Sequence, residues 1–393
     1  MSTLKTLNGN QSVAEAARQI DPDVVAAYPI TPSTSIVETI AKFKADGLIT
    51  GEFVCPESEH SAMSLCIGAA SGGGRVMTAT GSQGLALMWE MLYIAAGLRL
   101  PIVAGIVNRS LSAPINIHGD HSDTMGARDS GWIQIYSENC QEAYDNFIQA
   151  FRIAEHLDVR TPALVGLDGF IISHSLEGIQ VEDDEKIKKF AGEYKPVYPM
   201  LDTDQKKTVG PIDFTDYYFE HKRNQIEGIE NAPKVIEEVG KEFGKEFGRE
   251  YGFFEEYRTD DAEVCIVVMS SAAGTCKDAV DELRNQGKKV GLLKPRVFRP
   301  FPHRKIAEVL KRMKAVAVLD RSSSPGAFGA PLFTEIRSAL YDYPERPKIV
   351  NYVYGLGGRD IKGEHFKEVA SKLERIAKTG KVEEIYGYIN LRE

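Results

Sequence analysis

The first half of the chain alternates apolar runs of strand length with segments whose apolar positions follow a helical period. The apolar runs predict strands at Asp23–Pro29, Phe53–Cys55, Arg75–Ala79, Ile102–Val107 and Ala163–Leu167. The segments between them predict helices at Ser35–Asp46, Glu59–Ala70, Gly84–Ala96 and Gln141–His156. Strands separated by helices pair in parallel through right-handed crossovers. The pattern therefore predicts an α/β domain whose sheet is covered by helices on both faces.

A second pattern of the same kind runs from about residue 262 to the end of the chain. It predicts strands at Val264–Met269, Val290–Leu293, Ala315–Leu319 and Lys348–Val353. It predicts helices at Ala273–Gln286, His303–Met313, Phe328–Tyr341 and His365–Ala377. The fold class is thus α/β, with two parallel-sheet domains of different size.

The connector between these domains has a different composition. Residues 176–215 carry a charged run and several prolines, which indicates an extended segment. Residues Ala232–Tyr257 repeat the pattern Gly-Lys/Arg-Glu-Phe/Tyr every four residues, from Gly240 to Gly252. In a helix this spacing places the aromatic side chains on one stripe and the glycines on another. We expect an amphipathic connector helix whose glycine stripe lets a neighbouring element approach closely.

Composition excludes several classes of protein. The 393 residues hold 47 Lys and Arg against 56 Asp and Glu, a net charge of −9, which disfavours nucleic acid as the main partner. The five cysteines are scattered without a C-x-x-C pair, so they predict neither a disulfide framework nor a zinc or iron–sulfur ligand set. The N-terminal residues do not form a signal peptide, and the most apolar stretch, 85–107, is interrupted by charges and a proline. We expect a cytoplasmic protein without a membrane span.

Polar segments follow the predicted strands of the first domain, where ligands of parallel sheets bind. The first such segment is Tyr28-Pro29-Ile30-Thr31-Pro32-Ser33, whose hydroxyls can cap the next helix or meet a ligand. The next contains Glu57, Glu59 and His60 at a helix start, where a carboxylate suits the helix dipole and can also exchange a proton with a heterocycle.

Two further loops follow the next strands of the first domain. Thr80-Gly81-Ser82-Gln83-Gly84 is glycine-rich but is neither a G-x-G-x-x-G motif nor a phosphate loop. Arg109 directly follows a buried strand, where its guanidinium can bind a small carboxylate in a fork. The loop after it holds His118, Asp120, His121 and Asp123, but their spacing matches no common zinc site, so we expect no metal ligands there.

Two loops of the second domain also follow strands. Residues 320–329 and 355–360 can meet a ligand or a partner chain, and neither carries a nucleophile–base pair. We expect them to serve an interface.

Taken in order, these segments resemble the α subunits of the multi-subunit 2-oxoacid:ferredoxin oxidoreductases, in particular of pyruvate:ferredoxin oxidoreductase. The matching segments include residues 28–33, 57–62, 80–85, 108–123 and 128–132, and in the second domain Arg299-Pro300-Phe301-Pro302 and residues 355–360. The resemblance implies a pyrimidine-binding domain of thiamine-dependent enzymes at 1–180, a connector with an amphipathic helix at 181–260, and a transketolase C-terminal-like domain II at 261–393.

The resemblance also implies an activity, the oxidative decarboxylation of pyruvate with coenzyme A to acetyl-CoA, with ferredoxin as electron acceptor. Glu59 matches the family glutamate that hydrogen-bonds the aminopyrimidine ring of thiamine diphosphate. Thr31 and Arg109 match the residues that contact the pyruvate carboxylate. Other residues near the cofactor would be Pro29, Ile30, Gln83 and Gly84, and the loop of Asp120 and His121 would border the pocket.

Two absences in the sequence bear on the partners. The chain has no Gly-Asp-Gly segment followed by an Asn-Asn-type segment, which binds diphosphate through Mg²⁺ in thiamine enzymes, and no cysteine set for a [4Fe–4S] cluster. The resemblance places these groups on partner chains, among β, γ and δ subunits, and predicts that this chain is inactive alone. Two alternatives stay open: another 2-oxoacid as substrate, and a non-catalytic scaffold. A dinucleotide-binding dehydrogenase is disfavoured because no glycine fingerprint follows the first strand.

Overall fold

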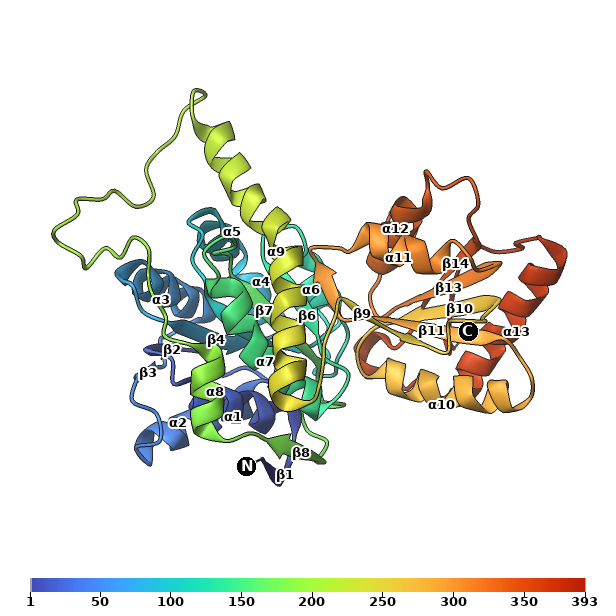
Figure 1. Ribbon diagram of the computed structural model, residues 1–393, viewed down its shortest axis with the longest axis horizontal. Helices are drawn as coiled ribbons and strands as arrows, with labels where there is room; N and C mark the ends of the chain where they lie inside the picture. The colour runs from blue at the N-terminus through green and yellow to red at the C-terminus, as the bar shows by residue number, and fades with distance from the viewer. Residues whose placement is uncertain (1, 393) are drawn as a thin grey trace.

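A computed structural model describes residues 2–392 and shows two α/β lobes side by side (Figure 1). The sheet of the first lobe has the strand order β12-β6-β7-β5-β4-β2-β3 and is parallel except for β12. Its strands are β2 (Val24–Ala26), β3 (Glu52–Val54), β4 (Val76–Thr80), β5 (Val103–Asn108), β6 (Ile133–Tyr136), β7 (Ala163–Asp168) and β12 (Val297–Arg299). The expected α/β fold is confirmed.

Helices cover both faces of this sheet. One face packs against α1 (Gly9–Ile20), α2 (Thr34–Ala45), α7 (Cys140–Glu155), α8 (Asp184–Ala191) and α9 (Tyr218–Phe247). The other face packs against α3 (Glu59–Gly72), α4 (Gln83–Leu87) and α5 (Trp89–Gly97). A short α6 (Ser122–Gly126) follows β5, and the small sheet of β1 (Thr3–Leu7) and β8 (Glu177–Val181) is antiparallel.

The second lobe has a six-stranded sheet of order β15-β14-β13-β10-β11-β9, parallel except for β9. Its strands are β9 (Phe254–Tyr257), β10 (Val264–Val268), β11 (Val290–Pro295), β13 (Ala315–Asp320), β14 (Lys348–Val353) and β15 (Tyr386–Tyr388). Its faces are covered by α10 (Ala272–Asn285) with α13 (Gly363–Thr379), and by α11 (His303–Leu310) with α12 (Pro331–Leu340).

The connector differs from its prediction at both ends. The helix expected at Ala232–Tyr257 is α9, which begins 14 residues earlier, at Tyr218, and ends at Phe247. Gly248 stops it in a left-handed conformation, with φ 78°, and residues 254–257 form β9 instead. The expected close approach is made by the returning chain, because a Cβ on Gly240 would lie 1.8 Å from the carbonyl oxygen of Tyr251. The helix expected at Gly84–Ala96 is divided into α4 and α5.

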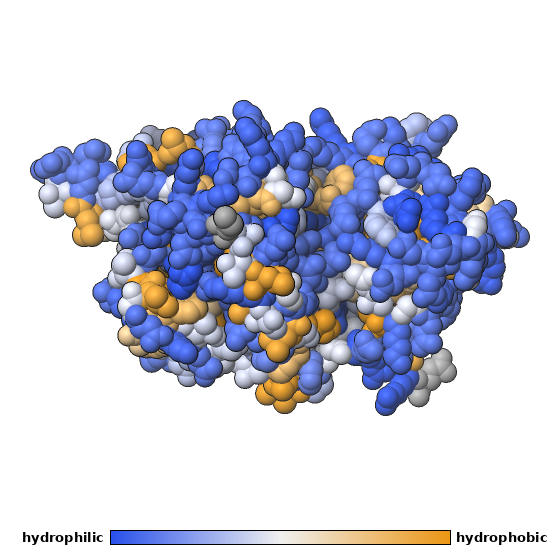
Figure 2. Space-filling model, turned by 60° about the horizontal axis from the view of Figure 1, so that its bottom comes forward, coloured by the Kyte–Doolittle hydropathy of each residue, from blue (hydrophilic) through white to orange (hydrophobic). Residues whose placement is uncertain are grey.

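The surface is mostly hydrophilic on the face shown in Figure 2, with apolar patches gathered over the first lobe. The loop between α8 and α9 projects from the body in Figure 1. That loop and the start of α9 expose many large apolar side chains: Tyr198, Met200, Leu201, Ile212, Phe214, Tyr217, Tyr218 and Phe219. None of the helices within residues 2–392 has the length and apolar character of a membrane span.

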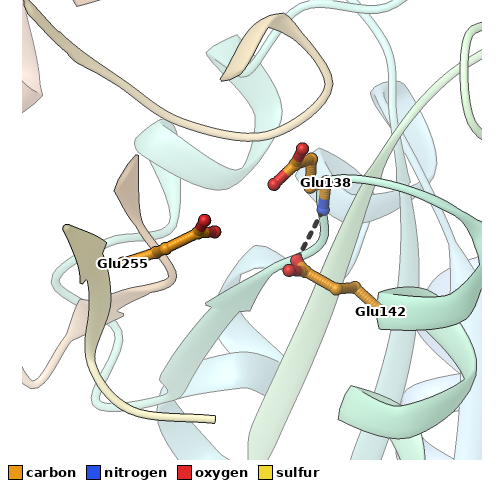
Figure 3. A group of neighbouring side chains, drawn as sticks. All are labelled: Glu138, Glu142 and Glu255. Atoms are coloured by element: carbon orange, nitrogen blue, oxygen red, sulfur yellow. Dashed lines mark hydrogen bonds between the residues drawn. The ribbon is translucent and has the colours of Figure 1, made fainter. Parts of the chain in front are cut away.

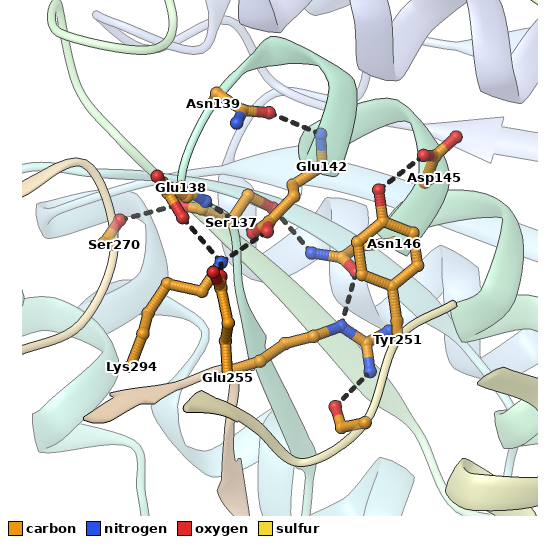
Figure 4. A network of polar contacts seen from close by, with 12 residues as sticks. Ser137, Glu138, Asn139, Glu142, Asp145, Asn146, Tyr251, Glu255, Ser270 and Lys294 are labelled. Atoms are coloured by element: carbon orange, nitrogen blue, oxygen red, sulfur yellow. Dashed lines mark hydrogen bonds and ion pairs between the residues drawn. The ribbon is translucent and has the colours of Figure 1, made fainter. Parts of the chain in front are cut away.

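The two lobes are joined by buried charged groups. The carboxylates of Glu138, Glu142 and Glu255 lie within 4.8 Å of one another (Figure 3). The ammonium of Lys294 binds all three, at 2.6, 2.6 and 2.9 Å, so a cation of the second lobe joins Glu255 of its own lobe to Glu138 and Glu142 of the first (Figure 4). Beside them, the buried guanidinium of Arg296 donates to side-chain oxygens of α7. These contacts fix the second lobe on α7.

Candidate functional site

The predicted site residues all lie at one edge of the first sheet, in the loops that follow the carboxyl ends of β2, β3, β4 and β5. Parallel pairing brings these four strand ends side by side. This is the edge at which ligands of open parallel sheets bind.

Glu59 and Gly84 are brought together. Ser58 caps α3 by accepting a hydrogen bond from the backbone N–H of Ser61, which places Glu59 in the first turn with 7% of its surface exposed. A Cβ on Gly84 would lie 2.8 Å from Oε1 of Glu59 and 2.4 Å from Oγ1 of Thr80. The absence of a side chain at Gly84 therefore lets this loop pack directly against the carboxylate of Glu59 and the hydroxyl of Thr80.

The Glu59 carboxylate and the Thr80 hydroxyl both lack a hydrogen-bond partner within residues 2–392. The hydroxyl of Thr80 is buried without a hydrogen bond. Within residues 2–392, no side chain or backbone group donates a hydrogen bond to the Glu59 carboxylate. Buried polar groups are nearly always satisfied, so the unpaired hydroxyl of Thr80 beside the unpaired carboxylate of Glu59 indicates a polar ligand at this edge. A flat heterocycle with ring nitrogens and an amino group has the donors and acceptors that fit them.

Thr31 and Arg109 are brought together as a second group. The guanidinium of Arg109, in a side chain that is only 6% exposed, donates from Nη1 to the carbonyl oxygen of Thr31 at 2.9 Å and from Nε to that of Asn116 at 2.8 Å. These bonds fix the guanidinium, while its second Nη has no hydrogen bond to the described residues. Thr31, which is exposed, supplies one of these carbonyls, so the pair can bind a small carboxylate.

Asp123 joins the two groups. Its Oδ2 accepts the backbone N–H of Ser82 at 2.9 Å and of Arg109 at 3.0 Å, which ties the loop after β4 to the loop after β5. Its Oδ1 accepts from the Asn108 side chain and from the N–H of Thr124. Burial raises the pKa of Asp123 to about 6, although these hydrogen bonds oppose the shift.

Asp120 and His121 face the second lobe. Asp120 accepts the N–H of Gly357 at 3.0 Å, and Nε2 of His121 lies 2.7 Å from the carboxylate of Asp168. The guanidinium of Arg321 binds the other oxygen of Asp168 at 2.7 Å. Burial alone would raise the pKa of Asp168, but Arg321 and His121 outweigh it and hold this pKa well below its usual range.

Two loops of the second lobe contact the first lobe of the same chain, and their predicted interface with a partner chain stays a prediction. Residues 320–329 and 355–360 contact the 116–121 loop of the same chain. Asp168 was missed in the sequence, although it has a readable signal as the polar last residue of a buried strand.

The remaining predicted residues contact their own loops. Ile30 accepts from the N–H and the hydroxyl of Ser33, so that hydroxyl does not cap α2. Gln83 accepts from the hydroxyl of Ser82, and Pro29 is exposed. The polar side chains of the 118–123 loop are used in the hydrogen bonds above. Within residues 2–392, three glutamates lie close enough together to hold a cation, and Lys294 already occupies their centre.

Comparison with known proteins agrees with this geometry. Residues 15–241 match the family described as pyruvate flavodoxin/ferredoxin oxidoreductase, thiamine diphosphate-binding. Residues 262–366 match the family described as pyruvate:ferredoxin oxidoreductase core domain II. The chain is 56% identical to the pyruvate synthase subunit PorA of Thermotoga maritima, over 92% of each chain. It is 43% identical to the ketoisovalerate oxidoreductase subunit VorA of Pyrococcus abyssi, over 99% of this chain and 98% of that one.

A solved structure shares the fold. The 2-oxoglutarate:ferredoxin oxidoreductase from Magnetococcus marinus, with 2-oxoglutarate, coenzyme A and succinyl-CoA bound, superposes with a TM-score of 0.72 at 19% identity. The match covers 95% of this chain and 65% of that one. The family matches span both lobes, and the first carries a thiamine diphosphate-binding domain. The chain is therefore a member of the thiamine-dependent 2-oxoacid:ferredoxin oxidoreductase family, on the side of its pyruvate-type subunits.

Proposed function

We propose that this chain is the α subunit of a pyruvate:ferredoxin oxidoreductase. The complex converts pyruvate and coenzyme A reversibly to acetyl-CoA and carbon dioxide, and it reduces ferredoxin. The observation that carries the proposal is the pair of unpaired groups against Gly84, the Glu59 carboxylate and the Thr80 hydroxyl, in a loop that Asp123 ties to the backbone N–H of Arg109. The identity to a pyruvate synthase subunit supports pyruvate as substrate.

The residues around Gly84 fit the aminopyrimidine of thiamine diphosphate. The cofactor supplies the carbon nucleophile that allows a 2-oxoacid to lose carbon dioxide. With the cofactor bound, Glu59 in the first turn of α3 would share a proton with a ring nitrogen of the pyrimidine. The hydroxyl of Thr80, which has no partner in the protein, would hydrogen-bond the same ring. Pro29, Ile30 and Gln83 border this region.

Arg109 and Thr31 orient the substrate. The free Nη of Arg109 and the hydroxyl of Thr31 bind the carboxylate of pyruvate, and the bonds of Arg109 to two backbone carbonyls keep the guanidinium in place. Asp120 and His121 act indirectly, because they hold the loop that carries Asn116 against the second lobe.

The remaining parts of the enzyme belong to partner subunits. We assign the diphosphate and Mg²⁺ to a β subunit and the [4Fe–4S] clusters to a δ subunit, with a γ subunit completing the complex. The apolar side chains exposed between residues 198 and 219 support burial against a partner chain. All five cysteines are free thiols, as is usual in a reducing cytoplasm.

Glu59→Gln in the assembled complex tests the proposal. The amide keeps the shape of the side chain and cannot hold the proton, so turnover should fall by about 10²–10⁴-fold. Glu57→Gln is the matched control, since Glu57 lies outside the helix, is exposed and accepts from Ser61. Its turnover should stay within about twofold of the wild type. A Glu59→Gln complex that assembles and keeps full turnover would show that this subunit is a scaffold.

A second candidate function is the same reaction on a branched-chain 2-oxoacid. It is favoured by the 43% identity to a ketoisovalerate oxidoreductase subunit, and Arg109 would recognise the carboxylate common to all 2-oxoacids. Comparison of kcat/KM for pyruvate, 2-oxoisovalerate and 2-oxoglutarate on one preparation of the complex separates these substrates.

A further inference from the structure

A second cavity lies at the opposite edge of the first sheet, with a volume of about 680 Å³. Its wall includes Arg99 and Pro101, which precede β5, and Arg160, which precedes β7. The chain from 194 to 225, which leads into α9 (upper left in Figure 1), forms the remaining wall. Strands of five or six residues, roughly 16–20 Å long, separate this cavity from the candidate active site.

Three half-buried cations line the cavity without a carboxylate partner. Arg99, Arg160 and Lys222 form no ion pair with any residue from 2 to 392. The one acid in the wall, Asp213, is hydrogen-bonded to His221. Burial lowers the pKa of Arg99, as does the positive charge of Arg160, while Glu227 opposes this shift from outside the wall. Three cations without an ion pair in one wall contrast with the net charge of −9 of the whole chain.

The arginines are fixed in place before any ligand binds. Arg99 donates to the carbonyl of Val159 at 2.8 Å and to Oδ1 of Asn224 at 2.9 Å, while its Nε is buried without an acceptor. Arg160 lies over the ring of Tyr198, with its guanidinium 5.5 Å from the ring centre. Both arginines have a left-handed backbone, with φ 54° and 43°, a strain that proteins retain mainly at functional positions.

We propose that this cavity binds a small organic polyanion, whose phosphate or carboxylate groups are held by Arg99, Arg160 and Lys222. The volume falls in the range of small-molecule sites, and prolines and tyrosines of the 194–211 segment offer apolar contact to the carbon skeleton. Because the site is remote from the reacting groups, the anion is an effector of the subunit rather than its substrate. The proposal does not depend on the reaction proposed above.

Calorimetric titration of the full chain tests the proposal, with sodium pyrophosphate, ADP and citrate as probes. At least one probe should bind saturably at one site per chain and bind more weakly at high salt. Arg160→Gln combined with Lys222→Gln should weaken that binding by about tenfold or more, because charged hydrogen bonds to the anion are lost. The matched control is Arg223→Gln, an exposed arginine paired with Glu230 at 2.9 Å, which should change binding by less than about twofold.

Which of the three probes bind identifies the chemical group that the cavity recognises. Binding of pyrophosphate and citrate alike indicates recognition of charge alone, whereas preference for ADP indicates contact with the base. The proposal is overturned if no probe saturates, or if Arg223→Gln weakens binding as much as the cavity variants. It is also overturned if no probe binds and the cavity variants instead release a partner subunit, which would assign the cavity to an acidic protein segment. If the double variant does not fold, binding is measured instead on the single variant Lys222→Gln.

Discussion

Single residues at the candidate site act mostly through backbone groups of neighbouring loops. The position of Arg109 after a buried strand was enough to predict its place at the sheet edge, and Glu59 was predictable from its helix start. The role of Asp123 was not, because its partners Ser82 and Arg109 come from other loops and the sequence shows only their residue types. A polar residue in such a loop can bind a ligand or can hold two loops together. Only the tertiary structure shows which of the two roles it has.

Arg109→Ala should raise the KM for pyruvate or abolish turnover, because it removes the fixed guanidinium beside Thr31. Arg109→Lys keeps the charge but cannot form the same fork, so it should recover only part of the loss. The measurement is kcat and KM for pyruvate in the assembled complex, with KM for coenzyme A as an internal control. An unchanged kcat/KM for pyruvate in Arg109→Ala would remove this residue from the carboxylate site.

The buried carboxylate of Asp320 gives a prediction for pH. Burial raises the pKa of Asp320 to about 6, against about 3.9 for an unfolded aspartate. As the pH falls, the folded state therefore binds this proton at a higher pH than the unfolded state does. The contribution of Asp320 to the free energy of unfolding thus decreases as the pH rises from about 4 through 6, by up to about 3 kcal/mol. From pH 7 to pH 5, the wild type should gain stability relative to Asp320→Asn in urea unfolding. A difference that stays constant with pH would contradict this.

At the scale of helices and strands, local sequence patterns predicted most elements. They failed where an element depends on a segment that is far away along the chain. The four-residue repeat continues to Gly252, yet α9 ends at Phe247, because the returning chain packs on Gly240 and Gly244. The strand β12 is three residues long and joins the first sheet by pairing with β6, more than 150 residues earlier in the chain, so it had no local signal. The missed α1 did have one, since Asn8 and Gln11 form a capping box before its apolar face.

Gly240→Ala tests the close approach on α9. A Cβ there would meet the carbonyl oxygen of Tyr251 at 1.8 Å, so the return segment must move. The free energy of unfolding should fall by about 2–4 kcal/mol. Gly68→Ala in α3 is the control, because a Cβ at that position meets no atom within 4 Å, and it should raise stability by about 0.5–1 kcal/mol. Equal effects of the two substitutions in chemical unfolding would refute the steric account.

At the scale of the whole molecule, the candidate site depends on how the two lobes are joined. The loop of Asp120 and His121 is held by Asp168, Arg321 and Gly357, and α7 is held by Lys294. The sequence predicted two α/β domains and an interface use for two loops. It could not predict the ion cluster, because Lys294 lies about 150 residues from Glu138 and Glu142 along the chain and the three carry no motif.

Lys294→Met should loosen the joined lobes. The substitution leaves the carboxylates of Glu138, Glu142 and Glu255 close together with only Lys277 beside them, which should cost about 3–5 kcal/mol of unfolding free energy. The control is Lys314→Met, because Lys314 forms an exposed pair with Glu263 and should contribute less than about 1 kcal/mol. Thermal and urea unfolding measure both. A Lys294→Met chain as stable as the Lys314→Met chain would show that the cluster does not hold the lobes.

The central claim is that this chain supplies part of a shared thiamine site that oxidises pyruvate. The most direct measurement is the reduction of viologen without oxygen, dependent on pyruvate and coenzyme A, by the complex that co-purifies with the tagged chain. We expect reduction by the complex, loss of it when either substrate is omitted, and none from the chain alone. Activity of the chain alone would contradict the shared site, and an intact thiamine-loaded complex that does not turn over pyruvate would contradict the proposed reaction.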